Sequence, residues 1–256
     1  MKTKIVVASH KEAWMPEDPV YLPVQAGRAA AETPLPGFTG DDSGENISSR
    51  NPHYCELTAL YWAWKNLDAD CLGLVHYRRH FAGKRFGALR TRIISGTALE
   101  KKLSRAPLLL PTPRHYFIET NRSQYVHAHH EADLETTRAV IAETFPEYLA
   151  AFDRVMRRTW GHRFNMFVMR REILDRYCRW LFAILFAVEK RLDISHYDPY
   201  NARVFGFLGE RLLDVWLEHE KVPFLEVPTL HLESQHWGRK IRNFLRRKFF
   251  PQYRPR

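Results

Sequence analysis

The stretch that most constrains this chain is segment 70–81, with the sequence DCLGLVHYRRHF. Its first half has the short apolar run of a buried strand, and the strand leads directly into a basic group. In open α/β sheets, ligands bind beyond the carboxyl ends of strands, and adjacent guanidinium groups suit phosphate or carboxylate. The segment therefore predicts either an anion site or arginines paired with neighbouring carboxylates. The polar residues in question are His76, Tyr77, Arg78 and Arg79.

The composition fits one α/β domain with a full core. The chain has 256 residues, of which 45% are hydrophobic and 13% aromatic. No apolar run reaches the roughly 18 residues of a membrane-spanning helix, and the run at the start is too short for a signal peptide. The separated Cys55, Cys71 and Cys178 predict reduced core thiols rather than disulfides or a zinc site. We therefore expect a cytoplasmic protein.

The positive charge is concentrated at the C-terminus. Eight of the ten net positive charges lie in residues 235–256, which contain no acidic residue. Apolar residues recur there at helical spacing, which favours a basic amphipathic helix on an anionic bilayer. A terminal helix docked on the domain has the same pattern. RNA binding is disfavoured because no nucleic-acid module accompanies the charge. We therefore divide the chain into a domain, 1–232, and a basic tail, 233–256.

Two more polar stretches accompany the first strand and the loop after it. The apolar run 4–8 predicts a buried first strand that ends in polar residues. The proline- and glycine-rich stretch 15–51 predicts an ordered loop, which contains GDDSGENIS. Its carboxylates and amide suit sugar hydroxyls, a ribose or a divalent cation, and they equally fit ordinary turn chemistry. The candidate residues are Ser9, His10, Lys11, Asp41, Asp42, Glu45 and Asn46.

The remainder predicts alternating helices and strands. Asn51 and Pro52 are the residue types preferred at the cap and in the first turn of a helix, and this helix leads into the central strand. A helix ending near Arg157 precedes a strand over 160–169, which contains Asn165. An apolar helix then covers 172–192, and a short last strand covers 225–227. Between these two, a further helix has Glu210 and Arg211 near its start. Glu210 suits a base, or simply a helix N-terminus with Arg203 or Arg211 as its ion-pair partner.

A second variable region, 82–135, is basic at first and then contains several histidines. His127, His129 and His130 with neighbouring acids do not match a zinc spacing, so we interpret this region as contacts to an acceptor molecule. The candidate acceptor-binding residues are His115, Tyr116, His127 and Asp133.

Several stretches, in this order and at matching spacing, resemble a bacterial family of capsular and exopolysaccharide biosynthesis proteins. They are KIVVASHK, GDDSGENIS, NPHYCELTALYWAWKN leading into GLVHYRRHF, FNMFVM and RVFGFLGERLLDVWL. The family is known as a domain of unknown function, of the DUF4422 type, and is assigned to the glycosyltransferases. The resemblance covers nearly all of residues 3–230. It implies a GT-A-like α/β domain with a central, mostly parallel sheet flanked by helices.

The resemblance also implies a chemistry. A hexosyltransferase would move a sugar from a nucleotide-sugar, a UDP-sugar such as UDP-galactofuranose, by direct displacement. The GT-A class usually has an Asp-x-Asp metal motif at the end of a central strand, where this chain has residues 76–78. We therefore expect a metal-independent enzyme without a cofactor, in which His76, Arg78 and Arg79 neutralise the leaving diphosphate. Asp41 and Asp42 keep a magnesium- or manganese-dependent version open.

The remaining roles follow from the same resemblance. Glu210 is the first candidate for the base that deprotonates the acceptor, with Asp133 and Glu119 behind it. The acceptor would be a glycan or a polyprenyl-diphosphate-linked glycan, and the tail would hold the protein at the inner face of the cell membrane. The alternative is a non-catalytic carbohydrate-binding or assembly subunit of a polysaccharide complex. The expected donor-binding residues are Ser9, His10, Lys11, Asp41, Asp42, Asn46, Tyr77, Arg79 and Asn165.

Overall fold

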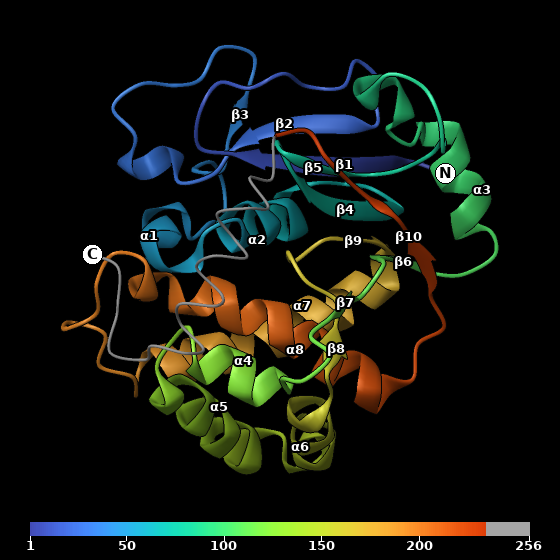
Figure 1. Ribbon diagram of the computed structural model, residues 1–256. Coiled ribbons are helices and arrows are strands. Elements are labelled where there is room, and N and C mark those ends of the chain that lie inside the picture. The colour runs from blue at the N-terminus through green and yellow to red at the C-terminus, as the bar shows by residue number, and fades with distance from the viewer. Residues whose placement is uncertain (234–256) are drawn as a thin grey trace.

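The computed structural model describes residues 1–233, and its centre is a mostly parallel β-sheet (Figure 1). The strands follow the order β10, β6, β9, β4, β1, β2 and β3 across the sheet. Strand β1 pairs in parallel with β4 and β2, whereas β9 runs antiparallel between β4 and β6. This confirms the predicted sheet. The strands span Thr3–Ser9 (β1), Tyr21–Gln25 (β2), Thr39–Gly40 (β3), Cys71–His76 (β4), Leu108–Pro111 (β6), Phe167–Arg170 (β9) and Leu225–Val227 (β10).

Four short strands lie outside that order. Strand β5, Arg79–Phe81, folds back antiparallel on the end of β4, and β11, Thr229–His231, pairs with β5. Strands β7, Arg114–His115, and β8, Trp160–Gly161, form a separate two-stranded sheet. The chain after β10 therefore returns to the edge at which β4 ends.

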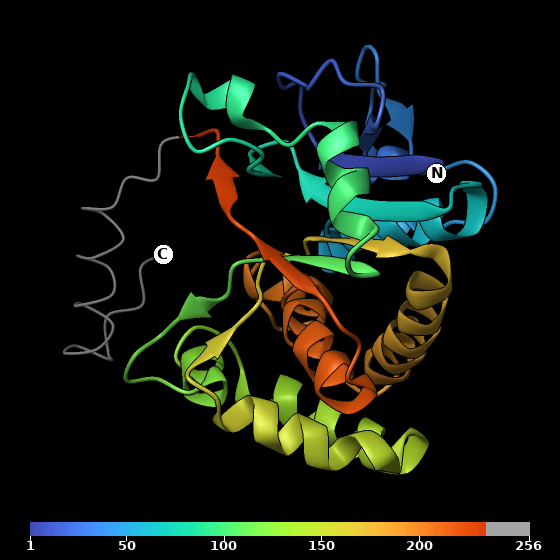
Figure 2. The ribbon, with the colours of Figure 1, turned by 90° about the vertical axis from the view of Figure 1, so that its right-hand side faces the viewer.

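Helices cover both faces of the sheet (Figures 1 and 2). Helix α3 packs on one face, α2, α7 and α8 pack on the other, and α4 to α6 form a further layer beyond them. The helices span Asn51–Tyr54 (α1), Leu57–Asn66 (α2), Gly96–Leu103 (α3), Asn121–Val126 (α4), Glu131–Thr144 (α5), Leu149–Arg157 (α6), Arg171–Glu189 (α7) and Val204–Glu220 (α8).

Two cores follow from the alternation of side chains along the strands. In β1, Ile5 and Val7 join the core beneath α3, and Val6 and Ala8 join the core formed with α2, α7 and α8. Each fully buried Val or Ile contributes about 1.5–3 kcal/mol relative to an exposed side chain. Both faces of the sheet are therefore covered by apolar cores, which directs attention to its strand ends as the place for a ligand.

Several predicted elements are confirmed. The first strand, the helix ending at Arg157, the apolar helix now seen as α7 and the strand Leu225–Val227 all form. The strand Leu225–Val227 is not the predicted last strand, because β11 follows it. Cys71 and Cys178 are buried free thiols, and Cys55 is a half-buried one. The loop 15–51, however, contains β2 and β3, which the sequence analysis did not anticipate.

Three predicted boundaries are wrong. The predicted strand over 160–169 is two short strands, β8 and β9, separated by a turn. Asn51 is not a cap, because it lies in α1, and this helix ends where Cys55 adopts a φ of 51°. Glu210 lies in the middle of α8, so a helix N-terminus does not account for it.

The predicted C-terminal tail, 233–256, lies outside the described residues except for Glu233. Its amphipathic helix, its contact with a bilayer and the boundary at 232 therefore stay predictions. Of the helices formed by residues 1–233, none has the length and apolar character to cross a membrane.

Candidate active site

The basic residues after β4 form a tight turn at the edge of the sheet. His76 pairs with Arg79 across this turn, and β11 continues the pairing beyond β5. The backbone N–H of Leu232 donates to the carbonyl of Arg78 at 3.0 Å. Because Ala8 of β1 is in register with His76 of β4, the residues after both strands lie together. The polar ends of β1 and β4 thus form one site.

The ring of Tyr77 is the centre of this site. The ring of His10 meets it edge-on with centroids 5.6 Å apart, Lys11 Nζ lies 5.0 Å from its centroid, and the guanidinium of Arg78 lies 5.7 Å away. Burial lowers the pKa of His10, and the charges of Lys11 and Arg78 lower it further. Arg203 adds a weaker effect of the same sign. These cations create a local field that favours an anion.

Ser9 shapes the end of β1. Its hydroxyl donates to the carbonyl of Lys11 at 2.6 Å and accepts from the Lys11 N–H at 3.3 Å. The Nζ of Lys11 also lies 3.2 Å from Glu233, which raises the pKa of the lysine. Lys11 is therefore an exposed cation whose backbone is held by Ser9 and whose ammonium group pairs with Glu233.

Arg78 and Arg79 have no ion pair with any carboxylate of residues 1–233, and the Nε atom of each is buried without a hydrogen-bond partner there. The guanidinium of Arg79 lies over the ring of Phe164, 4.2 Å from its centroid, which fixes its orientation. Burial lowers the pKa of Arg79, and the charge of Arg78 lowers it further. Two adjacent cations that lose water and gain no counter-ion are stabilised by a bound anion.

A buried amide, Asn165, connects this edge with helix α2. Its Nδ2 donates to Oε1 of Glu56 at 2.7 Å and to the carbonyl of Gly206 at 3.1 Å. The same Glu56 oxygen lies 3.8 Å from Nε2 of His76. That nitrogen is 2.5 Å from the carbonyl of Phe164, and burial lowers the pKa of the imidazole. His76 is thus engaged by protein groups, which argues against its predicted role as a cation facing the leaving group.

The turn before β9 is strained. Phe164 and Asn165 have φ values of 78° and 50°, a left-handed conformation that costs about 1–3 kcal/mol for each non-glycine residue. Helix α8 packs closely on this turn, since a Cβ on Gly209 would lie 3.0 Å from Oδ1 of Asn165. The strained pair holds Phe164 against Arg79. It also holds Asn165 against Glu56, so one turn orients a cation and a carboxylate.

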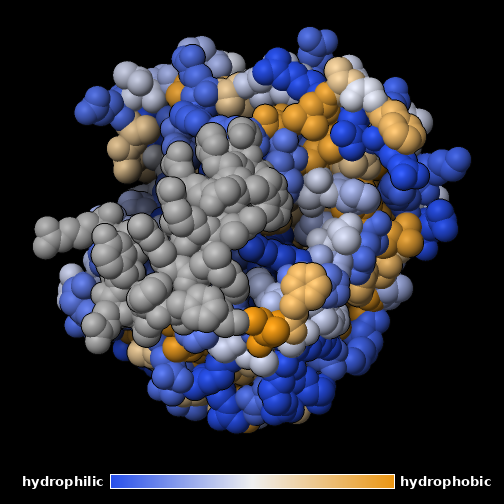
Figure 3. Space-filling model, viewed as in Figure 1, coloured by the Kyte–Doolittle hydropathy of each residue, from blue (hydrophilic) through white to orange (hydrophobic). Residues whose placement is uncertain are grey.

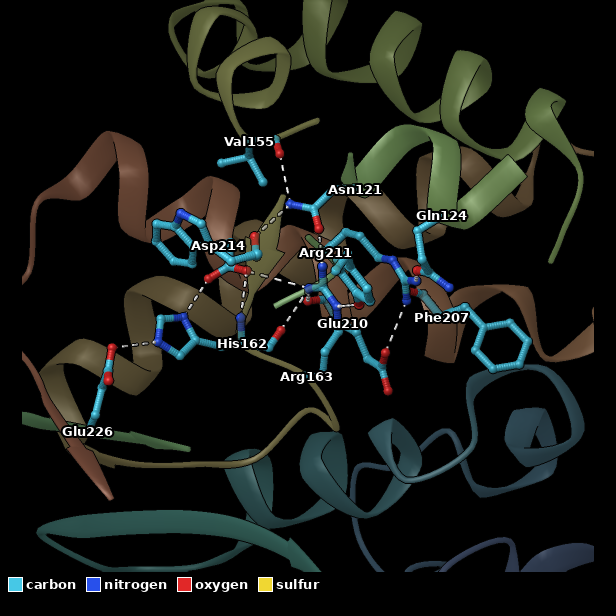
Figure 4. Close-up of polar contacts among 12 residues, drawn as sticks. Asn121, Gln124, Val155, His162, Arg163, Phe207, Glu210, Arg211, Asp214 and Glu226 are labelled. Carbon is cyan, nitrogen blue, oxygen red and sulfur yellow. Dashed lines mark hydrogen bonds and ion pairs between the residues drawn. The ribbon is translucent and has the colours of Figure 1, made fainter. Parts of the chain in front are cut away.

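Glu210 lies on α8 between this edge and a buried polar network (Figure 4). Its Oε2 accepts from the guanidinium of Arg211 at 3.0 Å, and Arg211 also donates to Gln124 at 2.7 Å. The Glu210 carboxylate favours the charged form of Arg79 without forming an ion pair with it. Glu210 is therefore a half-buried carboxylate close to the basic edge.

The buried polar network joins Asp214 of α8 to His162 and Arg163, which precede β9. Asp214 accepts from the backbone N–H of His162 at 2.9 Å and lies 2.6 Å from its Nδ1. Arg163 lies 3.5 Å from Asp214, donates to the carbonyl of Glu210 at 3.2 Å and donates to the hydroxyl of Tyr116 at 2.6 Å. These contacts fix the backbone that carries Glu210. Among the side chains of Asp214, His162 and Arg163, only Nε2 of His162 is without a hydrogen-bond partner in residues 1–233.

Residues 4–221 match the family described as "Domain of unknown function (DUF4422)". The chain belongs to this family. Among solved structures, the apo structure of the bifunctional glycosyltransferase WbbM is similar, with a TM-score of 0.85 and 28% sequence identity. The match covers 91% of this chain and 46% of that one, so this chain spans about half of its length. The similarity confirms the GT-A-like fold. No curated protein matches the chain.

In this DUF4422 member, the loop GDDSGENIS is held largely by its own residues. Asp41 is buried and accepts from the backbone N–H groups of 27–28, both at 3.0 Å, and from the hydroxyl of Ser48 at 2.5 Å. Asn46 donates to the carbonyl of Asp42 at 3.0 Å. Turn chemistry therefore accounts for Asp41 and Asn46, whereas Asp42 is exposed and remains a candidate ligand. No three metal-ligating side chains within the described chain gather into a cluster.

Two predicted acceptor residues lie in a separate region formed by α4 and α5. Asp133 is buried and accepts from the hydroxyls of Tyr125 at 2.8 Å and Tyr197 at 2.6 Å. Burial raises the pKa of this carboxyl. His127 is exposed, and its Nδ1 lies 2.6 Å from Glu119. These contacts give structural roles to Asp133 and Glu119, the two further candidates for the base.

The other two acceptor candidates lie on β7 and the turn after it. Tyr116 borders the Glu210 network through its hydrogen bond with Arg163. His115 is exposed beside it, and the turn then presents Phe117, 87% exposed, and Ile118, 67% exposed. This turn can contact a large acceptor, whereas Asp133 and His127 are already engaged by neighbouring side chains.

The sequence analysis missed three residues of the site. Glu56 was hidden in a stretch interpreted only as a helix, because the break at Cys55 that turns it toward Asn165 has no sequence signal. Arg203, whose Nε donates to Cys55 Sγ at 3.1 Å, was treated only as a possible partner for Glu210. Phe164 was treated as part of a strand.

Proposed function

We propose that the chain is a glycosyltransferase that transfers a sugar from a UDP-sugar to a glycan acceptor. The observation that carries this proposal is the pair of adjacent guanidinium groups, Arg78 and Arg79, which have no carboxylate partner in residues 1–233 and lie at the carboxyl edge of a parallel sheet. The diphosphate of a nucleotide-sugar matches two such forks in charge and geometry. The likeness to WbbM, a bifunctional glycosyltransferase, supports the same class of reaction.

In the proposed reaction, the acceptor oxygen attacks the anomeric carbon while the bond from that carbon to the diphosphate oxygen breaks. The bonding electrons leave with the diphosphate, whose negative charge therefore grows in the transition state. Arg78 and Arg79 stabilise this charge, and Lys11 and Arg203 strengthen the positive field around it. The aromatic ring of Tyr77 and the polar end of β1 form the surroundings of the nucleotide.

We propose that these cations do the work that a divalent metal does in most GT-A enzymes. Residues 76–78, which end in Arg78, stand where the resemblance implies an Asp-x-Asp motif, and Arg79 follows directly. The proposal predicts turnover that persists in EDTA and that added magnesium or manganese leaves unchanged. Turnover that is lost in EDTA and restored by either ion would overturn it.

The proposed base is Glu210, which would remove the acceptor proton as the new bond forms. Glu56 is the alternative. Its Oε1 receives a hydrogen bond from a neutral amide, whereas Oε2 of Glu210 is already engaged by the guanidinium of Arg211. Glu210→Gln and Glu56→Gln separate the two, because the essential base loses turnover while UDP binding persists. Near-wild-type turnover in Glu210→Gln would exclude that residue.

The proposed acceptor is a growing surface glycan, linked to a polyprenyl diphosphate at the inner face of the cell membrane. The basic tail would bring the site to this lipid, as a peripheral protein and not through a spanning helix. UDP-galactofuranose is the first donor to test. Incubation of the purified protein with radiolabelled UDP-sugars and lipid-linked acceptors, with and without EDTA, measures transfer directly. Binding of glycans with no transfer from any donor would favour the non-catalytic subunit.

A further inference from the structure

An exposed basic loop, residues 84–90, projects from the edge of the sheet. The sequence is KRFGALR, and no acidic residue occurs between positions 82 and 99. Lys84, Arg85 and Arg90 are all exposed. None of the three forms an ion pair with a carboxylate in residues 1–233. Their charge is therefore available to an external partner.

The same loop exposes apolar side chains among these charges. Phe86 is 78% exposed and Leu89 is 39% exposed. The guanidinium of Arg85 lies 5.3 Å from the centroid of the Phe86 ring, and that of Arg90 lies 4.7 Å from the ring of Trp14. Exposed apolar groups of this size, surrounded by polar residues, are typical of interaction surfaces.

The loop is anchored at its base. The N–H of Gly83 donates to the carbonyl of Arg92 at 2.7 Å, and that of Ala82 donates to Pro228 at 2.8 Å. Gly87 adopts a φ of 113°, which lets the chain reverse at the tip. These contacts give the projecting loop a defined direction.

Its position relates the loop to the candidate active site. Residues 79–81 of β5 lead into the loop and also pair with β11, after which the chain approaches the basic tail. The start of β11 lies beside the base of the loop, since Thr229 pairs with Phe81 and the N–H of Ala82 donates to the carbonyl of Pro228; Figure 2 shows this flank of the molecule. The turn that carries Arg78 lies at the other end of β5.

We propose that loop 84–90 docks on an anionic bilayer, with its cations at the lipid headgroups and Phe86 and Leu89 inserted between them. Charge complementarity and interleaved apolar side chains are the properties that membrane-surface segments combine. Nucleic acid matches the charges and offers bases to stack on Phe86, but it offers no apolar environment for Leu89, and the loop belongs to no recognisable nucleic-acid module. The purpose of docking, access to a lipid-linked acceptor, rests on the proposed function; the surface itself does not.

Flotation with phosphatidylcholine vesicles, with and without phosphatidylglycerol, tests this docking on the full chain. The test variant is Lys84→Gln/Arg85→Gln/Arg90→Gln, which spares Arg92 because its side-chain Nε donates to the carbonyl of Lys84 within the loop. The matched control is Arg157→Gln/Arg179→Gln/Lys190→Gln. It removes the same charge from three exposed residues that form no ion pair in residues 1–233.

Each basic residue near an anionic surface contributes roughly fivefold to partitioning. The test variant should therefore bind phosphatidylglycerol vesicles on the order of a hundredfold more weakly, and the control should bind like wild type. A second variant, Phe86→Ser/Leu89→Ser, should also bind more weakly at unchanged charge. Equal binding by the test variant and the control would overturn the proposal, as would loss of single-stranded RNA binding with vesicle binding intact. UDP titration of the same samples tests the proposed transferase separately. Absence of UDP binding would count against the transferase and would leave the docking of loop 84–90 on a bilayer unaffected.

Discussion

Two arginine-rich regions of this molecule differ in how their charges are satisfied. Arg163 lies in the buried network with Asp214 and Tyr116; burial acts to lower its pKa, but these partners outweigh burial and the pKa is raised. Arg79, at the β4–β5 turn, has no such partner in the described part of the chain, and its pKa is lowered. An arginine is thus structural in the buried network and available for a ligand at the β4–β5 turn.

The comparison teaches that burial alone does not mark a functional arginine. Arg163 is 4% exposed and more deeply buried than Arg79, yet its hydrogen bonds are satisfied by the protein. What distinguishes the turn is two adjacent cations without an ion pair to any carboxylate of residues 1–233, and a strained backbone that orients one of them. The Nε of Arg211 also has no partner there, but its guanidinium pairs with Glu210 at 3.0 Å. The predictions below separate these two kinds of site.

The largest expected effect is on stability. Asp214→Ala removes the carboxylate that pairs with His162 and Arg163, and it leaves a buried charge uncompensated. Breaking a buried pair in this way typically costs 3–5 kcal/mol, so the free energy of unfolding in urea should fall by about that amount. Unchanged stability would contradict the structural role of the network. Arg138→Gln, at an exposed ion pair with Asp153, is the control and should cost about 0–1 kcal/mol.

The next effect is on turnover. Arg79→Met keeps an apolar stem against Phe164 but removes the charge that we propose stabilises the leaving diphosphate. Removal of one such group typically lowers kcat by about 10²–10³-fold. Steady-state transfer assays should show this loss with the unfolding free energy nearly unchanged, the opposite pattern to Asp214→Ala. Wild-type turnover in Arg79→Met would show that the partnerless arginine has no part in the reaction.

A smaller effect should follow from the strained turn. Asn165→Gly removes the steric cost of a φ of 50° but also removes the hydrogen bond to Glu56. The two changes offset each other in stability, whereas misplacement of a site residue typically lowers the rate by about tenfold to a hundredfold. We therefore expect an unchanged melting temperature with reduced kcat. Reduced stability with normal kcat would assign Asn165 to the scaffold alone.

The smallest effect concerns pH. The pKa of His10 is lowered, so the side chain is neutral near pH 7 and gains its charge below the usual histidine range. An anion favours the charged form, so affinity for a UDP-sugar should rise as the pH falls through this lowered pKa. The free energy of unfolding should instead fall as the pH falls, because the unfolded chain takes up this proton at a higher pH than the folded chain does. The UDP-sugar diphosphate does not titrate in this range, and His10→Gln should abolish the affinity change; if it persists, another group is responsible.

The sequence predicted the fold well where a signal was local. The apolar runs of β1 and β4 and the long apolar helix α7 depend on side-chain periodicity, which is visible in the chain. Strand β2 was missed because Pro23 lacks an N–H and argues against a strand. In the structure, β3 pairs with only the last two residues of β2, so this strand tolerates the proline.

The site was predicted in outline but not in its contacts. Tyr77, Arg78 and Arg79 were identified because a basic group directly follows an apolar strand. The roles of Glu56 and Asn165 depend on left-handed backbone at Cys55 and Phe164, which tertiary packing imposes. No spacing rule in the sequence brings residues 56 and 165 together.

The most direct test of the central claim is a calorimetric titration with UDP in EDTA. The account predicts saturable binding to the wild-type protein and to Arg138→Met, and at least a tenfold loss of affinity in Arg78→Met/Arg79→Met, because each charge-assisted hydrogen bond contributes about 1.5–3 kcal/mol. Equal UDP affinity with and without the two arginines, or binding that requires a divalent ion, would contradict it.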